Sequence, residues 1–246
     1  KDYFGEQGKF KGAIYRPFAY ETEFEPEKLD EKSNFEYVQQ EQLFDFMRRL
    51  LVKRFESSFG AFEQSIRRFK RITENAQEFI KKTDKYILDR ALLEKIYSLD
   101  EEQIEQELAD FAEILKRGDF PKNNRIYDLT RFTDRKGFLS DIQSDLDLFD
   151  HILEELEKMD LVNDDPKAKC LIEHITDVLD QKPLVGEPKR KVIIFSEYMD
   201  TVKHLAKSLK KAFGGRVLVE DGGLSTVKIK EINRDFDASN NEPTDL

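Results

Sequence analysis

Apolar residues recur at helical spacing through much of the chain. Over residues 41–72 and 73–116 they fall three or four positions apart, with Gly60 as a weak point and a break at Leu99-Asp100, which is the period of amphipathic helices. A later run has the spacing of a seam between two helices: Ile142, Leu146, Phe149, Leu153 and Leu156. We expect a bundle or antiparallel hairpin of long helices over residues 41–160, in which the last helix packs on the earlier ones.

Residues 1–40 have a different pattern, because three glycines and two prolines leave no room for a long helix. Aromatic residues are frequent here: Tyr3, Phe4, Phe10, Tyr15, Phe18, Tyr20 and Phe24. A cluster of apolar side chains is normally buried against another part of the protein or against a partner. We expect an irregular segment whose natural neighbour has been cut away.

The pattern changes again after residue 160. Asp165-Pro166 has the form of a helix start, because Asp caps a first turn and proline suits it. This linker helix and a connector rich in proline and glycine are expected to fill residues 161–188. Four apolar residues in a row, Val192–Phe195, then suit a strand covered on both faces, as in a parallel sheet.

That strand runs directly into helical periodicity. One apolar face is formed by Val202, Leu205, Ala206, Leu209 and Phe213, and a separate cationic stripe by Lys203, Lys207 and Lys211. This stripe fits a face turned to solvent as well as one turned to DNA. Gly214-Gly215 is expected to end the helix, residues 216–220 to form a second strand and residues 225–236 a second helix. The expected fold class is α/β overall but mostly α, with long helices followed by an incomplete parallel β-α-β-α unit over 189–246.

The net charge of −10 hides an uneven distribution. Residues 42–72 carry eight basic and three acidic side chains, and residues 189–236 carry eleven basic and six acidic ones. Residues 98–165, in contrast, carry eight basic and twenty acidic side chains. Each basic segment therefore has a net charge of about +5, enough to attract phosphates. For the first segment, the alternative is a solvated face whose cations lay their stems along apolar surface.

Composition restricts the setting of the protein. No apolar run approaches the ~20 residues needed to cross a bilayer, and the N-terminus lacks the pattern of a signal peptide. A single cysteine, Cys170, and three histidines leave no ligand set for a structural zinc site. We expect a cytoplasmic protein and take the sequence for a piece of a longer one.

The sequence contains no motif for catalysis. A phosphate-binding Gly-x-x-x-x-Gly-Lys-Ser/Thr is missing, and Asp30-Glu31 follows no apolar strand. His174 and His204 are expected to be ordinary helix residues, and Cys170 a buried, inert thiol. We predict that these 246 residues alone bind no nucleotide and no metal and catalyse no reaction.

Three segments occur in an order known from one class of motor proteins. Residues 165–175 read Asp-Pro-Lys-Ala-Lys-Cys-Leu-Ile-Glu-His-Ile, residues 191–205 read Lys-Val-Ile-Ile-Phe-Ser-Glu-Tyr-Met-Asp-Thr-Val-Lys-His-Leu, and Gly222-Gly-Leu-Ser225 leads to a helix ending in Phe-Asp. They resemble the helix before the second RecA-like lobe, motif IV and the next block of superfamily-two helicases, especially Swi/Snf-type ATP-dependent DNA translocases. The basic segment 49–58 resembles the one after the first lobe in bacterial helicase-like proteins.

The resemblance implies an intact protein that binds ATP and Mg²⁺ between two lobes, hydrolyses the ATP and steps along double-stranded DNA. The ATP-binding motifs would lie outside these residues, and the helical region would be an insertion between the lobes. Ligands gather at carboxyl ends of parallel strands and phosphates at helix N-termini, while arginine grips a phosphate with two bonds. The implied DNA-binding residues are Arg49, Lys53, Arg54, Ser196, Glu197, Tyr198, Gly223, Ser225 and Lys228.

Two alternatives stay open. Ser196–Tyr198 also fits a plain turn between a strand and a helix. The whole chain also fits a protein-interaction module, in which the acidic helical region docks a protein partner and the α/β part is its scaffold.

Overall fold

The computed structural model describes residues 2–5, 7–21, 31–88, 101–117, 125–184, 189–220 and 225–236. The chain divides into two compact units. The first comprises residues 1–56 and 62–159, and the second comprises residues 57–61 and 160–246.

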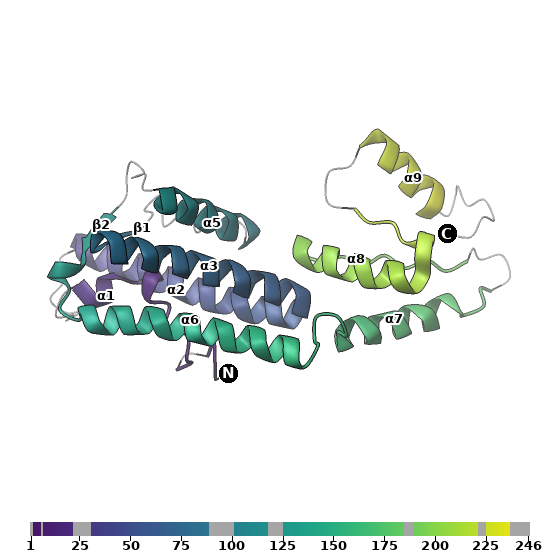
Figure 1. Cartoon of the computed structure of the whole chain (residues 1–246). Coiled ribbons are helices and arrows are strands. Elements are labelled where there is room, and N and C mark those ends of the chain that lie inside the picture. The colour runs from purple at the N-terminus through teal and green to yellow at the C-terminus, as the bar shows by residue number, and fades with distance from the viewer. Residues whose placement is uncertain are drawn as a thin grey trace. The chain divides into compact units, whose positions relative to one another are not determined.

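Three long helices form the frame of the first unit (Figure 1): α2 (Glu31–Ser57), α3 (Phe59–Thr83) and α6 (Arg135–Lys158). The long helix expected over 41–72 is thus broken at Ser58, whose hydroxyl accepts a hydrogen bond from the Ala61 N–H at 3.3 Å and caps α3. Helix α3 runs antiparallel to α6, since Gln77 bonds Gln143 at 3.0 Å and Lys70 bonds Asp150. The expected bundle of long helices is confirmed.

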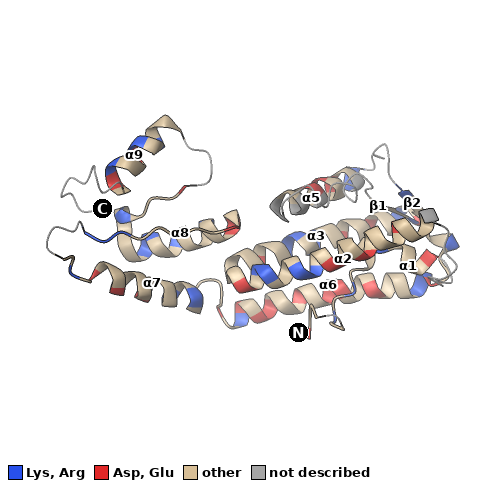
Figure 2. Cartoon of the chain, turned by 180° about the vertical axis from the view of Figure 1, so that it is seen from behind, with Lys and Arg blue, Asp and Glu red and all other residues tan. Residues whose placement is uncertain are grey.

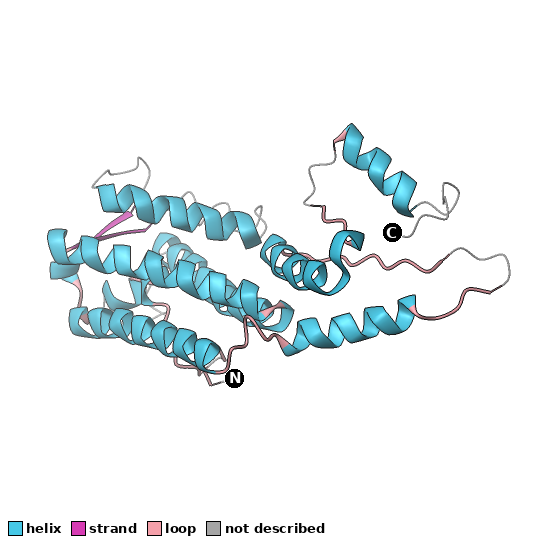
Figure 3. Ribbon diagram, turned by 45° about the vertical axis from the view of Figure 1, so that its right-hand side comes forward, coloured by secondary structure: helices cyan, strands magenta, loops and turns pink. Residues whose placement is uncertain are grey.

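Smaller elements complete the first unit: η1 (Ala13–Tyr15), α1 (Phe18–Glu21), β1 (Lys85–Leu88), α5 (Glu101–Arg117), β2 (Arg125–Asp128) and η3 (Leu129–Arg131). The prediction that helix continues through residues 85–88 is wrong, because this segment pairs with β2 as a two-stranded antiparallel sheet (Figure 3). Asp84, at φ 55°, turns the chain out of α3. The break expected at Leu99-Asp100 lies outside the described residues, which leave out 89–100 and 118–124.

The N-terminal segment is the centre of the first unit's core. Phe10 packs on Phe44 of α2 and Phe149 of α6, with ring centroids 5.8 and 5.9 Å apart, and Tyr15 meets Phe69 of α3. Phe10, Tyr15, Phe18 and Tyr20 are all buried. The expectation of a missing neighbour is therefore wrong for these residues, because the neighbours are the chain's own helices; Phe24 lies outside the described residues.

Buried polar groups hold the backbone of this segment in place. The Asp145 carboxylate of α6 accepts hydrogen bonds from the N–H groups of Lys11 and Gly12 at 2.6 and 2.8 Å. Gln40 of α2 accepts from the Phe18 N–H at 2.9 Å. Gly12 has φ 58°, and a Cβ there would lie 2.3 Å from the Phe44 ring, so only glycine fits this turn.

The described residues of the second unit form three helices and a short turn of 3-10 helix: α7 (Pro166–Leu179), α8 (Met199–Phe213), η4 (Gly214–Arg216) and α9 (Thr226–Phe236). The predicted start of α7 is confirmed, since the Asp165 carboxylate accepts from the N–H groups of Lys167 and Ala168 at 2.8 and 3.4 Å. The predicted end of α8 is confirmed too, at Gly214 with φ 64°. The Asp165 cap and the Gly214 end each depend on residues within about one helical turn.

The two predicted strands of this unit are not formed. Residues 191–196 and 217–220 have no regular secondary structure, and Gly214–Arg216 is 3-10 helix. A strand is stable only when neighbouring strands satisfy its backbone groups, and the described residues of this unit contain no such neighbour. The structure is therefore mostly helical, and the parallel sheet of the expected β-α-β-α unit is not seen.

Candidate nucleic-acid interface

The turn before α8 holds three of the residues implied in DNA binding. The Ser196 hydroxyl donates to the Tyr198 carbonyl and accepts from the Tyr198 N–H, both at 3.3 Å. Tyr198 is buried at 5% exposure, while Glu197 is exposed. The Ser196 oxygen is thus engaged in a local turn, and an exposed carboxylate beside it repels phosphate. Ser196, Glu197 and Tyr198 therefore offer no positive charge to a phosphate.

The exposed face of α8 is cationic. Lys203, Lys207, Lys210 and Lys211 are all exposed, and Figure 2 shows their helix marked by blue bands. Among the described residues, no carboxylate forms an ion pair with any of these four lysines. A row of ammonium groups at steps of four, three and one along a helix has the charge and spacing to follow a chain of phosphates.

Charges on α9 are partly neutralised within the unit. Lys228 pairs with Glu220 at 3.2 Å, and Arg234 pairs with Asp235 at 2.7 Å. The neighbouring Arg234 lowers the pKa of Asp235. The Ser225 hydroxyl accepts from the Lys228 N–H at 3.3 Å, so it caps α9 instead of offering its oxygen to a ligand; Gly223 lies outside the described residues.

The basic segment of the first unit is split between two faces of α2. Arg49 and Lys53 are exposed one turn apart, where they can meet solvent or a phosphate. Arg54 is fully buried, with 0% of its surface exposed. The structure therefore keeps Arg49 and Lys53 as candidates and withdraws Arg54, because a phosphate contact requires an accessible guanidinium.

A polar junction in the second unit was missed by the sequence interpretation. His204 of α8 lies with its Nε2 3.1 Å from the buried Asp165 carboxylate. Its ring rests on Gly60, where a Cβ would come within 2.2 Å of Nδ1. Nearby, Ser57 and Thr201 share a hydrogen bond of 2.8 Å. No sequence signal joins these residues, because Asp165 and His204 are 39 positions apart.

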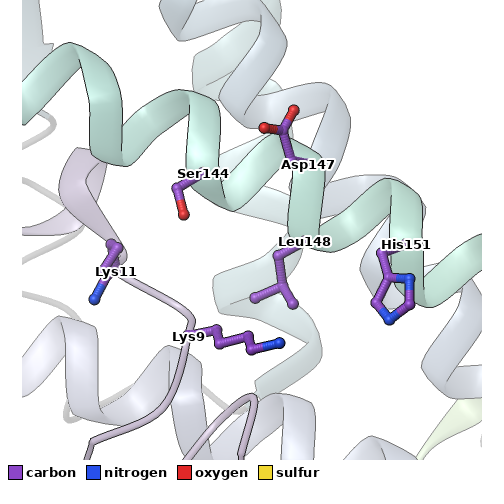
Figure 4. Close-up of a pocket in the computed structure, with 6 residues that line it drawn as sticks. All are labelled: Lys9, Lys11, Ser144, Asp147, Leu148 and His151. Carbon is purple, nitrogen blue, oxygen red and sulfur yellow. The ribbon is translucent and has the colours of Figure 1, made fainter.

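A pocket of about 330 Å³ lies in the first unit between the N-terminal segment and α6. It is lined by Lys9, Lys11, Ser144, Asp147, Leu148 and His151 (Figure 4). Lys9 lies over the Tyr3 ring, whose hydroxyl meets His151 Nε2 at 3.1 Å. In Figure 4 the two lysines point in different directions and Asp147 points away from both. The polar groups therefore do not converge on one ligand position.

A metal site and a membrane-spanning helix are both absent from the described residues. No group of three His, Cys, Asp or Glu side chains there is arranged to hold a metal ion. No helix within those residues is long and apolar enough to cross a membrane. Cys170 is exposed on α7, so the expectation that it is buried is wrong.

The second unit thus presents four exposed lysines on α8, a helix that begins within the segment 191–205 that resembles motif IV. The chain matches no protein-family model, no curated protein and no solved structure.

Proposed function

We propose that this chain is part of an ATP-dependent, helicase-like DNA translocase and that its second unit contributes contacts to duplex DNA. One observation carries the proposal: residues 191–205, which resemble motif IV, run into α8, and four lysines of this helix are exposed. Phosphate contacts supply most of the affinity of a protein that binds DNA without reading its sequence. In this proposal the α8 lysines replace Ser196 and Glu197 as the main contacts.

The proposal includes a RecA-like sheet in the intact protein. Ile193 and Phe195 are 65% and 90% exposed in the segment expected to be a buried strand. Side chains of this kind are normally covered in a parallel sheet. We propose that residues 191–196 and 216–220 become strands when further strands pair with them.

ATP and Mg²⁺ would be bound by motifs outside these residues. This chain's part would be to hold DNA and to connect two lobes, so no step of hydrolysis is assigned to any of its side chains. The protein-interaction module, in which the acidic helical region docks a protein partner, stays the second candidate, favoured by exposed carboxylates of α6 that include Asp147 and Glu154.

The experiment is a binding titration with a labelled duplex at several salt concentrations. Each phosphate contact contributes about 0.9 to the slope of log affinity against log salt. Replacing Lys203 and Lys207 by Glu should therefore weaken binding at low salt by at least tenfold and reduce the slope by about 1.8.

The matched control carries the same change of charge on the first unit, at Lys81 and Lys82, which are exposed on α3. Binding that is absent at low salt contradicts the proposal. Equal losses in both variants assign the binding to overall charge and also contradict it.

A further inference from the structure

The helix α2 has a second apolar face that points away from the core of the first unit. Its inner face is fully buried through Leu43, Met47, Leu50 and Leu51. On the outside, Phe35 is 64% exposed, Val38 40% and Val52 38%, while Phe55 is 45% exposed at the margin of this face, where its ring packs edge-on against Phe62 with the centroids 5.2 Å apart. Apolar groups on an outer face mark an interaction surface.

The outer face has the spacing of a helix–helix seam. The exposed residues Phe35, Val38, Gln42, Asp45, Arg49, Val52 and Glu56 follow one another at steps of three and four. This is the pattern by which one helix packs along another. The seam spans about 30 Å, at 1.5 Å per residue.

The outer face is also symmetric about its midpoint, Asp45. Val38 and Val52 lie seven positions before and after it, and Phe35 and Phe55 lie ten positions before and after it. Charges have opposite signs on the two sides: Glu41 precedes Asp45 by four positions, whereas Arg48 and Arg49 follow it. The valine pair and the phenylalanine pair are therefore alike on the two sides of Asp45, and Glu41 and Arg49, each four positions away, have opposite charges.

This symmetry identifies the occupant. We propose that two copies of the chain associate through α2, antiparallel, about a two-fold axis at Asp45. In such a pair Val38 of each copy packs on Val52 of the other. The Phe35 and Phe55 side chains cover the ends of the seam, and Glu41 lies beside the arginines of the second copy. A two-fold axis pairs one patch with itself, which a self-complementary face satisfies.

One residue opposes the dimer. The two Asp45 side chains meet at the axis, where like charges repel. Within each chain Arg48 Nη2 lies 3.0 Å from Asp45 Oδ1 and partly offsets that charge. The dimer is therefore expected to be weak and open to strengthening at this position.

Disulfide trapping tests the register. With the exposed Cys170 replaced by Ser, a mixture of Val38→Cys and Val52→Cys chains should oxidise to a heterodimer. Each variant alone should not, because equal positions fourteen residues apart would be separated by about 21 Å, beyond disulfide reach. A dimer from Val38→Cys alone would indicate parallel packing and overturn the proposal.

Sedimentation equilibrium of the full chain tests the energetics. Val38→Glu should raise the dimer dissociation constant at least tenfold, and Asp45→Leu should lower it at least tenfold. Ile126→Glu is the matched control, because Ile126 is 51% exposed on β2 of the same unit, and it should change nothing. A chain that stays monomeric even with Asp45→Leu overturns the proposal, as does equal dissociation by Ile126→Glu.

Discussion

The two units differ in how completely they bury their own apolar residues. In the first unit aromatic rings from the N-terminal segment, the sheet and all three long helices meet in one core, and Phe138 and Phe149 have no exposed surface. In the second unit large apolar side chains are exposed before α8 and on α9: Leu184, Ile193, Ile194, Phe195, Val227 and Ile229. The first unit thus encloses a core of its own, whereas the described residues of the second unit contain no sheet that could cover these side chains.

The difference follows from what each kind of element needs. A long amphipathic helix satisfies its own backbone and requires only a partner for one face. A strand in a parallel sheet requires neighbours on both edges and cover on both faces. Helices α7, α8 and α9 therefore form in the second unit while its predicted strands do not.

The largest effect expected from this contrast is a pair of phenylalanine truncations. Phe138 is fully buried, with Tyr20 and Phe132 each 5.1 Å away between ring centroids, so Phe138→Ala should cost about 3–5 kcal/mol of unfolding free energy. Phe195 is 90% exposed, and Phe195→Ala should change the free energy of unfolding by less than about 0.5 kcal/mol. Urea unfolding followed by far-ultraviolet circular dichroism measures both.

A comparable loss in the two variants would break the contrast between the units. It would mean that Phe195 is covered in solution, as it would be in a completed sheet. The same measurement on a longer chain that supplies further strands should then show a cost at Phe195 while the cost at Phe138 stays unchanged.

A smaller effect concerns the charge buried in the first unit. Burial raises the pKa of Asp145 to about 7, although the N–H groups of Lys11, Gly12 and Ala13 lower it and only the neighbouring Asp141 adds to the rise. The pKa in the unfolded chain is about 3.9, so the folded protein holds this proton more tightly. The resulting stabilisation is full below about pH 4 and is lost as the pH rises through 7.

Between pH 5 and 8 the free energy of unfolding should therefore fall by about 2–3 kcal/mol from this group. Asp145→Asn should remove that slope, while Asp147→Asn, at an exposed position of the same helix, should keep it. Near-ultraviolet circular dichroism follows the first unit, because seven of the eight tyrosines precede residue 160. An unchanged slope in Asp145→Asn would show that the carboxylate is ionised in the folded protein throughout this range.

Local signals in the sequence predicted the helices well. The Asp165 cap, the Gly214 stop and the seam of α6 each involve residues within a few turns of one another, where spacing and side-chain chemistry determine the backbone. Ile142, Leu146 and Phe149 are buried as the seam requires. The same kind of signal failed at Tyr86–Leu88, whose apolar residues fit a helix and a strand equally well.

Contacts distant in sequence explain what could not be predicted. Strand β1 forms because Tyr86 pairs with Tyr127 and donates its hydroxyl to the Ile14 carbonyl at 2.6 Å. The aromatics of residues 1–20 were assigned to a lost neighbour because no local pattern shows that α2, α3 and α6 enclose them. For the candidate site, the lysine stripe of α8 was visible in the sequence, but the burial of Arg54 and Tyr198 was not.

The smallest of these effects tests the polar junction formed by Gly60, Asp165 and His204 in the second unit. A Cβ on Gly60 would lie 2.2 Å from His204 Nδ1, and His204 is held from the other side by Asp165 at 3.1 Å. Gly60→Ala should therefore cost about 1–3 kcal/mol through overpacking, offset by up to about 1 kcal/mol because alanine favours the helix.

The comparison with His204→Ala separates the cost of overpacking from the gain in helix propensity. Once the imidazole is gone the clash is absent, so adding Gly60→Ala to His204→Ala should be neutral or stabilising by up to about 1 kcal/mol. Hydrogen exchange of the α8 amides is the suitable readout, because it reports on this unit alone. If Gly60→Ala costs the same with and without His204, the ring does not rest on Gly60. In that case His204 is held by Asp165 alone.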